Sequence, residues 1–240
     1  MKKLSLVLVS AIAAGVACGR DLYSSEEHPG TPLEICLADP ISLPQSNWNV
    51  YGLRLNLLFG QSFGVYGVDL GFASRCRDKF VGLAAQSFNW TESDMTGVQL
   101  GALGNVVNGN ATGLQLGGLG NSDHGVFKGL QVAAVNYVGT LTGAQLGVVN
   151  WNKSVSAGAQ FGLANIDANE FHGLSLGALN YTGKLLGAQI GLINVVAESA
   201  HGVQFGVFNA TPSLQGFQIG LLNVIGNGLL PIMPFVNGSF

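Results

Sequence analysis

The sequence predicts an all-β protein built from one short unit repeated in tandem. Three observations predict it: a motif that recurs every 14 to 16 residues, a period-two alternation inside each copy, and turn-forming residues between copies. Charged residues make up only 10% of the chain, and Gly accounts for 36 of 240 residues. A disordered chain would be polar and highly charged, so this composition argues against disorder. The net charge of -3 gives no electrostatic basis for binding nucleic acid.

The first residues predict an export signal. Lys2 and Lys3 precede a short apolar stretch, 4–17, that ends in small residues, and this order is typical of a secretory signal peptide. Cys18 follows the small residues directly, so it is a candidate for lipidation. We therefore expect an exported protein at the outer membrane or cell surface of a Gram-negative bacterium.

Three regions follow from this pattern: a signal peptide over 1–17, a linker with a possible first strand over 18–48, and a repeat domain over 49–240. Two cysteines, Cys36 and Cys76, remain after the signal. In an oxidising compartment they could pair, and two free or buried thiols are an equal alternative.

The repeat reads Gly-x-Gln-x-Gly-x-x-Asn. Its clearest copies are 143–150, 158–165, 187–194, 202–209 and 216–223. Weaker copies open at Gly52, Gly67, Gly82, Gly97, Gly113, Gly129 and Gly173, and a last copy without glycines spans 230–237. The array therefore holds 13 units, and it is the strongest signal in the sequence.

Each unit has two faces, which we describe by numbering its first Gly as position 0. The even positions from -2 to +6 read apolar, Gly, Gln, Gly and apolar, whereas positions +1, +3 and +5 are apolar and +7 is Asn. Position -1 is variable and often polar. This alternation predicts one strand of about ten residues per unit, followed by a tight turn.

The favoured architecture is an up-and-down antiparallel transmembrane β-barrel of about 12–14 strands, because a tilted ten-residue strand crosses a bilayer. The lipid bilayer is then the expected partner, and Trp90, Tyr137, Trp151 and Tyr181 would form an interfacial girdle. An upstream strand near 33–37 would bring the strand count to 14. The glutamines would line the lumen of a narrow pore: Gln99, Gln115, Gln131, Gln145, Gln160, Gln189, Gln204 and Gln218.

The alternative is a β-solenoid whose coil is one 15-residue repeat. The glycines would then occupy corners with positive φ, positions +1, +3 and +6 would fill the core, and stacked Gln and Asn would form ladders. Pro231 and Pro234 favour this alternative, because a closed barrel needs its ladder donors. Gly104 and Gly120 replace the Asn in two units, so a ladder would be interrupted there.

Few residues suggest chemistry. Arg54 and Asp69 both occupy the Gln position in adjacent units, so we expect a structural ion pair, with a charged pore constriction as the alternative. His172 and His201 both lie at position -1, where surface histidines are expected rather than a metal pair, since no carboxylate or Cys shares their face. Ser175 replaces a Gln and lies in no nucleophile motif. We expect no catalytic, cofactor or metal site and no enzyme activity.

The repeat array, together with the opening 50–58 and the closing 230–237, resembles a family of bacterial surface-repeat proteins known from Leptospira and other Gram-negative lineages. The resemblance covers residues 32–240. It implies a cell-surface or outer-membrane location and supplies no site residues. The expected role is structural or pore-like for a barrel, and surface adhesion or scaffolding for a secreted or lipid-anchored solenoid, whose ligand the sequence does not reveal.

Overall fold

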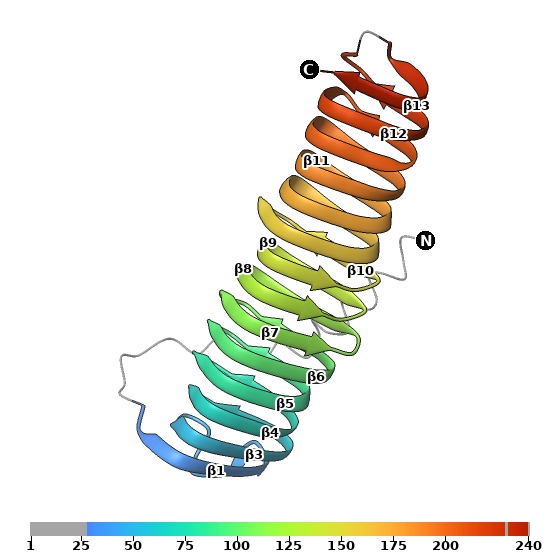
Figure 1. The fold of residues 1–240 in the computed structure, drawn as a ribbon. Coiled ribbons are helices and arrows are strands. Elements are labelled where there is room, and N and C mark those ends of the chain that lie inside the picture. Colours follow the sequence, from blue (N-terminus) through green and yellow to red (C-terminus); the bar gives the residue numbers. More distant parts are fainter. Residues whose placement is uncertain (1–27, 229, 240) are drawn as a thin grey trace.

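The chain forms a long rod in which one sheet winds around itself in successive coils (Figure 1). The computed structural model describes residues 28–228 and 230–239. The expected signal peptide and Cys18 lie outside these residues. The ten strands of the coils, in chain order, are β3 (Asn49–Ser62), β4 (Val65–Cys76), β5 (Phe80–Thr91), β6 (Met95–Val107), β7 (Ala111–Gly117), β8 (Gly120–Val132), β9 (Val135–Leu146), β10 (Val149–Asn152), β11 (Ser156–Thr211) and β12 (Ser213–Ile225).

Neighbouring coils are parallel and in register, so the chain is a β-solenoid and the barrel prediction is wrong. Equivalent repeat positions pair directly, as in Gly52 with Gly67 and Gly143 with Gly158. The physical reason lies in the Asn at +7. The motif reads alike in both directions only from -2 to +6, whereas an antiparallel neighbour would set the Asn against the unrelated residue at -3. Parallel stacking places each Asn beside the equivalent Asn of the neighbouring coil.

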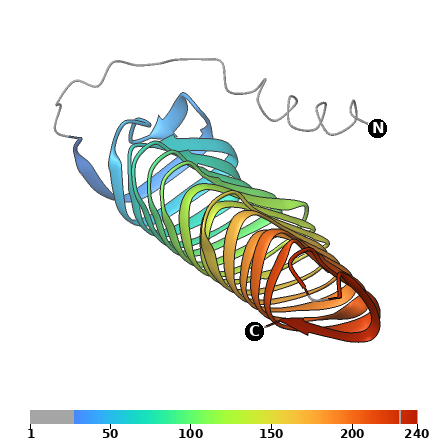
Figure 2. The same ribbon diagram turned by 90° about the horizontal axis from the view of Figure 1, so that it is seen from above.

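Each coil is a flattened loop with two faces and two edges (Figure 2). One face carries positions -2 to +3, and the other begins at the Asn. The apolar edge lies between them at positions +5 and +6, and the opposite, polar edge carries the turn residues before the next -2 position. The backbone stays extended around both edges in β11, which runs for 56 residues. The expected pattern of ten-residue strands with tight turns is therefore wrong for this part.

The apolar edge is formed by large side chains that point outward in successive coils. Several are more than half exposed, including Leu163 at 64% and Leu221 at 63%. We define the apolar edge by these residues: Leu57, Leu58, Phe72, Leu103, Leu119, Val135, Val148, Leu163, Leu179, Leu192, Ile193, Val207, Leu221 and Leu222.

The core is narrow and half polar. Position -2 supplies most of its apolar part, with Phe80, Phe127, Phe171, Leu141 and Leu214 all at most 2% exposed. The column two places after the Asn adds Val107, Val138, Val196 and Ile225. The Gln, the Asn and the residue two places after the Asn point into the same interior. Positions +1, +3 and +6 face outward, so the expectation that they fill the core is wrong. Parity explains this for +1 and +3, because side chains alternate along a strand and -2 and +2 are the inward pair. Position +6 shares the inward parity, but it lies at the apolar edge, where the chain turns and the alternation is reset so that the Asn at +7 points inward.

Each end of the described solenoid is closed by a strand that runs antiparallel to its neighbour. β1 (Gly30–Ala38), which confirms the upstream strand, lies parallel to β3, and β2 (Ile41–Leu43) folds back antiparallel on β1. β13 (Ile232–Ser239) runs antiparallel to β12, so reading 230–237 as a further coil is wrong. This segment has no glycine at position 0, and Pro234 cannot donate to a ladder, which suits an edge strand.

Candidate functional site

The most regular feature of the interior is a ladder of asparagine side chains that spans ten coils. Each Nδ2 donates to the Oδ1 of the next coil over 2.8–3.0 Å. The same Nδ2 donates to the backbone carbonyl at position +3 of the next coil, where the chain begins to turn, over 2.9–3.1 Å. The members are Asn89, Asn105, Asn121, Asn136, Asn150, Asn165, Asn180, Asn194, Asn209 and Asn223.

The expected interruption of this ladder at Gly104 and Gly120 is wrong. Asn105 and Asn121 follow those glycines directly and take the ladder position. The coil absorbs the extra residue by shifting register between β5 and β6 near Phe88, at the apolar edge. The fold therefore keeps the amide stack and lets the outer edge bulge, because an unpaired buried amide costs more than an extra exposed residue.

The glutamines form a second ladder, whose donors point the other way. Each Gln Nε2 donates to the Oε1 of the preceding coil over 2.7–3.3 Å. Ser175 breaks the series: its Oγ donates to Gln160 Oε1, and Gln189 donates instead to Thr182 Oγ1. All eight glutamines predicted to line a lumen, Gln99, Gln115, Gln131, Gln145, Gln160, Gln189, Gln204 and Gln218, are buried in this packed core.

Replacing Asn165 with alanine is expected to lower the free energy of unfolding by about 3 kcal/mol, because it strips partners from several buried polar groups. Asn165 donates to Asn180 Oδ1 and to the Leu176 carbonyl, and it accepts from Asn150. Urea unfolding followed by circular dichroism measures the loss. Asn169→Ala is the matched control, since that side chain makes one exposed bond to a backbone carbonyl. Equal losses for the two variants would contradict a stabilising ladder.

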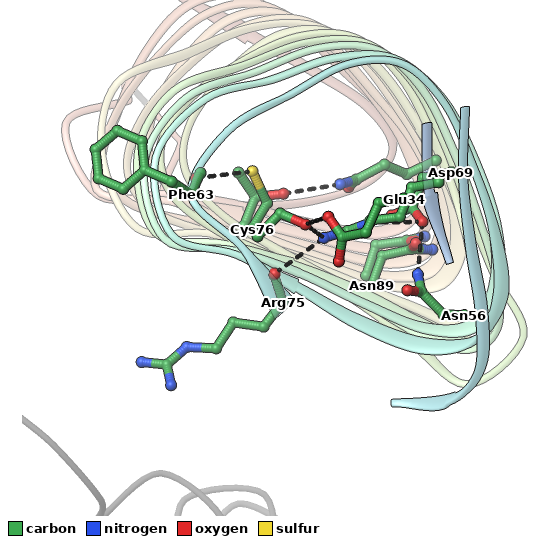
Figure 3. A network of polar contacts seen from close by, with 12 residues as sticks. Glu34, Asn56, Phe63, Asp69, Arg75, Cys76 and Asn89 are labelled. Atoms are coloured by element: carbon green, nitrogen blue, oxygen red, sulfur yellow. Dashed lines mark hydrogen bonds and ion pairs between the residues drawn. The ribbon is translucent and has the colours of Figure 1, made fainter. Parts of the chain in front are cut away.

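A buried charged cluster replaces the ladders at the N-terminal end of the solenoid (Figure 3). Arg54 Nε and Nη2 donate to the two carboxylate oxygens of Asp69 over 2.9 and 2.5 Å, so the predicted ion pair is confirmed as a contact. Arg54 also donates to Ser62, which donates to Glu34 over 2.6 Å, and Asn56 donates to Asp69. Burial raises the pKa of the Glu34 carboxyl, against the opposing effects of the Ser62 hydrogen bond and of Arg54. The cluster ties β1, β3 and β4 together.

The single substitution Arg54→Gln is expected to cost about 3 kcal/mol of stability, because it leaves the Asp69 carboxylate buried without its cation. The double variant Arg54→Gln/Asp69→Gln should recover most of this loss, since Gln is the residue of this column in later coils. Urea midpoints of the two variants and the parent test the coupling. A double variant that is less stable than the single one would show that the cluster does more than balance charge.

The two cysteines are separate buried thiols, not a disulfide. Cys36 Sγ donates to the Phe59 carbonyl over 3.2 Å, and Cys76 Sγ donates to the Lys79 carbonyl over 3.2 Å. Burial raises the pKa of Cys76 to about 12, against the opposing effect of Arg54. Of the two alternatives that the sequence left open, the structure shows the free thiols.

Two buried carboxyls, Asp123 and Asp167, were not predicted from the sequence. They lie two places after a ladder Asn, a column that continues the inward period-two pattern and could have been found from it. Asp123 accepts from Gln115 and Gln131, and Asp167 accepts from Asn152 over 2.7 Å. Burial raises the pKa of each carboxyl to about 7, although these hydrogen bonds act in the opposite direction.

The histidines lie on the outside, as predicted. His172 Nε2 lies 2.5 Å from Glu170 Oε1, so the expectation that no carboxylate shares its face is wrong. Glu170 escaped notice because it belongs to the polar edge, two residues before His172. Among the residues that the structure describes, no three His, Cys, Asp or Glu side chains gather as metal ligands would. The predicted absence of catalytic, cofactor and metal sites stays a prediction.

The charged residues and the most exposed apolar residues of the outer surface lie at opposite edges, and positions +1 and +3 add further exposed apolar side chains, such as Phe161 and Phe205, on the first face. Most of the half-buried and exposed charged side chains of the coils occupy the polar edge: Arg77, Asp78, Lys79, Glu92, Asp94, Lys153, Glu170, Lys184 and Glu198. Arg75 and Lys128 lie on the adjoining faces, and Arg75 pairs with Glu92 and stacks on Trp90. The apolar edge carries no charged residue. The aromatic column predicted as a girdle, Trp90, Tyr137, Trp151 and Tyr181, lies on the face directly after this edge.

Comparison with known proteins gives no match to a family model, a curated protein or a solved structure. In the part of the chain that the structure describes, no helix has the length and apolarity needed to span a membrane.

Proposed function

We propose that this chain is an exported surface protein with a structural role, a β-solenoid scaffold that presents its outer faces at the bacterial cell surface. The observation that carries this proposal is the hydrogen bonding of the buried side chains. The Asn and Gln side chains bond mainly to their own copies in neighbouring coils, so the core holds the rod together and leaves its outside for recognition. Because the core is filled with side chains, it favours a scaffold role and not the pore-like role expected of a barrel.

The signal-like segment 1–17 and the resemblance to bacterial surface-repeat proteins support export. Cys18 is the proposed site of lipidation, which would tether the rod by its N-terminal end. The low charge content and the apolar outer columns are typical of a protein that works against another surface.

Cell location tests the proposal. The full chain, carrying an epitope tag in the exposed turn near Lys153, is expected to be degraded when intact cells are treated with protease, while a cytoplasmic marker survives. Metabolic labelling with a fatty acid should mark the parent and not Cys18→Ala. Recovery of the protein only in the protected cytoplasmic fraction would overturn the surface role.

A further inference from the structure

The structure points to a second property of the rod: we infer that the apolar edge is a docking surface for a phospholipid bilayer, on which the solenoid lies along its length. The inference deepens the proposed surface role. It rests on that role only for the cellular location of the membrane that the rod binds. Its physical basis is the partition of the outer surface between one apolar and one charged edge.

The size and continuity of the apolar edge are the first argument. It begins at Leu57 and ends at Leu222, and it receives large aliphatic or aromatic side chains from most coils between them. With coils about 4.8 Å apart, it extends for roughly 50 Å. Soluble monomers seldom leave a contiguous apolar patch of this size uncovered, so a partner is implied.

The backbone beneath this edge is the second argument, because lipid tolerates only backbone whose polar groups are paired. Coils exchange hydrogen bonds along the edge itself: the Leu163 amide donates to the Val148 carbonyl over 3.0 Å, and the Leu119 amide donates to the Leu103 carbonyl over 2.8 Å. The edge can therefore meet hydrocarbon without exposing these groups to it.

The flanking columns are the third argument, and they favour lipid over protein. Trp151 and Tyr181, 48% and 40% exposed, follow the apolar edge on the second face, where amphipathic rings would reach the headgroups of a bilayer. The charged residues gather on the opposite, polar edge. This cross-section matches that of an interfacial amphipathic helix, which buries one side in the acyl boundary and keeps the other in water.

A second copy of the chain fits the edge less well. Protein interfaces carry about one hydrogen bond per 100–200 Å² and charged groups at their rim, whereas the side chains of this edge offer neither donors nor acceptors. A uniform row of leucines and valines would also let two rods slide past each other, because nothing in it sets a register. A fluid lipid surface needs no register.

The test is flotation of the purified full chain with neutral phosphatidylcholine vesicles. The variant Leu163→Glu/Leu192→Glu/Leu221→Glu alters three exposed side chains of the apolar edge. Its matched control, Ala168→Glu/Asn169→Glu/Ala197→Glu, adds the same charge on the polar edge. Circular dichroism must show that both variants keep the parent's β structure. We expect the edge variant to lose at least tenfold in vesicle affinity and the control to keep the parent's affinity.

A second measurement separates docking by this edge from binding by any other segment. In a Trp48→Phe/Trp90→Phe background, Trp151 is the remaining tryptophan, and brominated lipids should quench its fluorescence when the rod is bound. Equal flotation of the edge variant and the control would overturn the inference, as would sedimentation as a stable dimer through the edge without vesicle binding. Since these assays use purified protein, their failure leaves the surface location standing, and intracellular location of a vesicle-binding rod would sink only the proposed function.

Discussion

Gly158→Ala is expected to destabilise the protein by about 5 kcal/mol, because the new methyl group has no space and the backbone has no alternative conformation. Gly158 has φ +136, and a Cβ built on it would lie 1.8 Å from the carbonyl oxygen of Gly143 in the preceding coil. The twelve position-0 glycines share this conformation, so the contact recurs at each inter-coil step. To relieve it, the coils on either side would have to separate.

The matched control is Gly120→Ala. At Gly120 a Cβ meets only the Val135 carbonyl oxygen at 3.4 Å, and the residue paired with it in the next coil is itself Val135. We expect the control to change the free energy of unfolding by less than about 1 kcal/mol, measured by urea denaturation of both variants. If Gly158→Ala unfolded at the parent's midpoint, the stacking geometry at position 0 would be wrong.

The second large effect is a loss of stability as pH rises from about 4 to about 7. Asp123 and Asp167 both have a folded pKa near 7, above the ordinary 3.8, so the folded state holds protons that the unfolded state has already released. The free energy of unfolding is therefore greatest at pH 4 and below, as far as these groups are concerned. Between pH 4 and pH 7 the free energy of unfolding falls by roughly 4 kcal/mol for each carboxyl. Above pH 7 it stays constant with respect to these groups.

Asp123→Thr isolates one of these carboxyls. Thr occupies the same inward column at Thr91 and Thr182, where its hydroxyl accepts from a Gln in the way Asp123 does. Urea unfolding at pH 4.5 and pH 8 should show the variant gaining stability over the parent at pH 8 and losing part of the parent's pH slope. An unchanged slope in Asp123→Thr would mean that this carboxyl is already ionised in the folded protein at low pH.

The strand content and the alternation could be predicted from the sequence, because period-two order and a fixed repeat length are local properties. The burial of the glutamines was not predicted, since the barrel placed them in a lumen and the solenoid alternative placed positions +1, +3 and +6 in the core. The direction of neighbouring units was predicted wrongly, because the favoured barrel required antiparallel strands and the coils are parallel. The stretch from -2 to +6 is close to a palindrome, and only the Asn at +7 distinguishes parallel from antiparallel stacking. The expected ten-residue strands and the low charge content favoured a barrel. In the structure, each unit bends at its +5 and +6 positions and forms one coil of the solenoid.

The polar interior was harder to predict for a different reason. The Arg54–Asp69 pair follows from two charges in one repeat column, and the structure confirms the contact. Asn105 and Asn121 were not predicted as ladder residues, because the Asn was expected seven residues after the first Gly. In these two units one extra residue at the apolar edge moves the Asn to the eighth position. Asp123 and Asp167 were overlooked because the column after the Asn was counted as turn, although its side chains point inward.

The reversed strand β13 ends the parallel stack of the described coils. A parallel last strand would offer its open side to the next copy of the same motif, whereas an antiparallel one presents a different pattern of donors and acceptors. Within the stack, each 15-residue unit adds about 4.8 Å to the length. Duplication or loss of one unit would therefore lengthen or shorten the rod by this fixed increment.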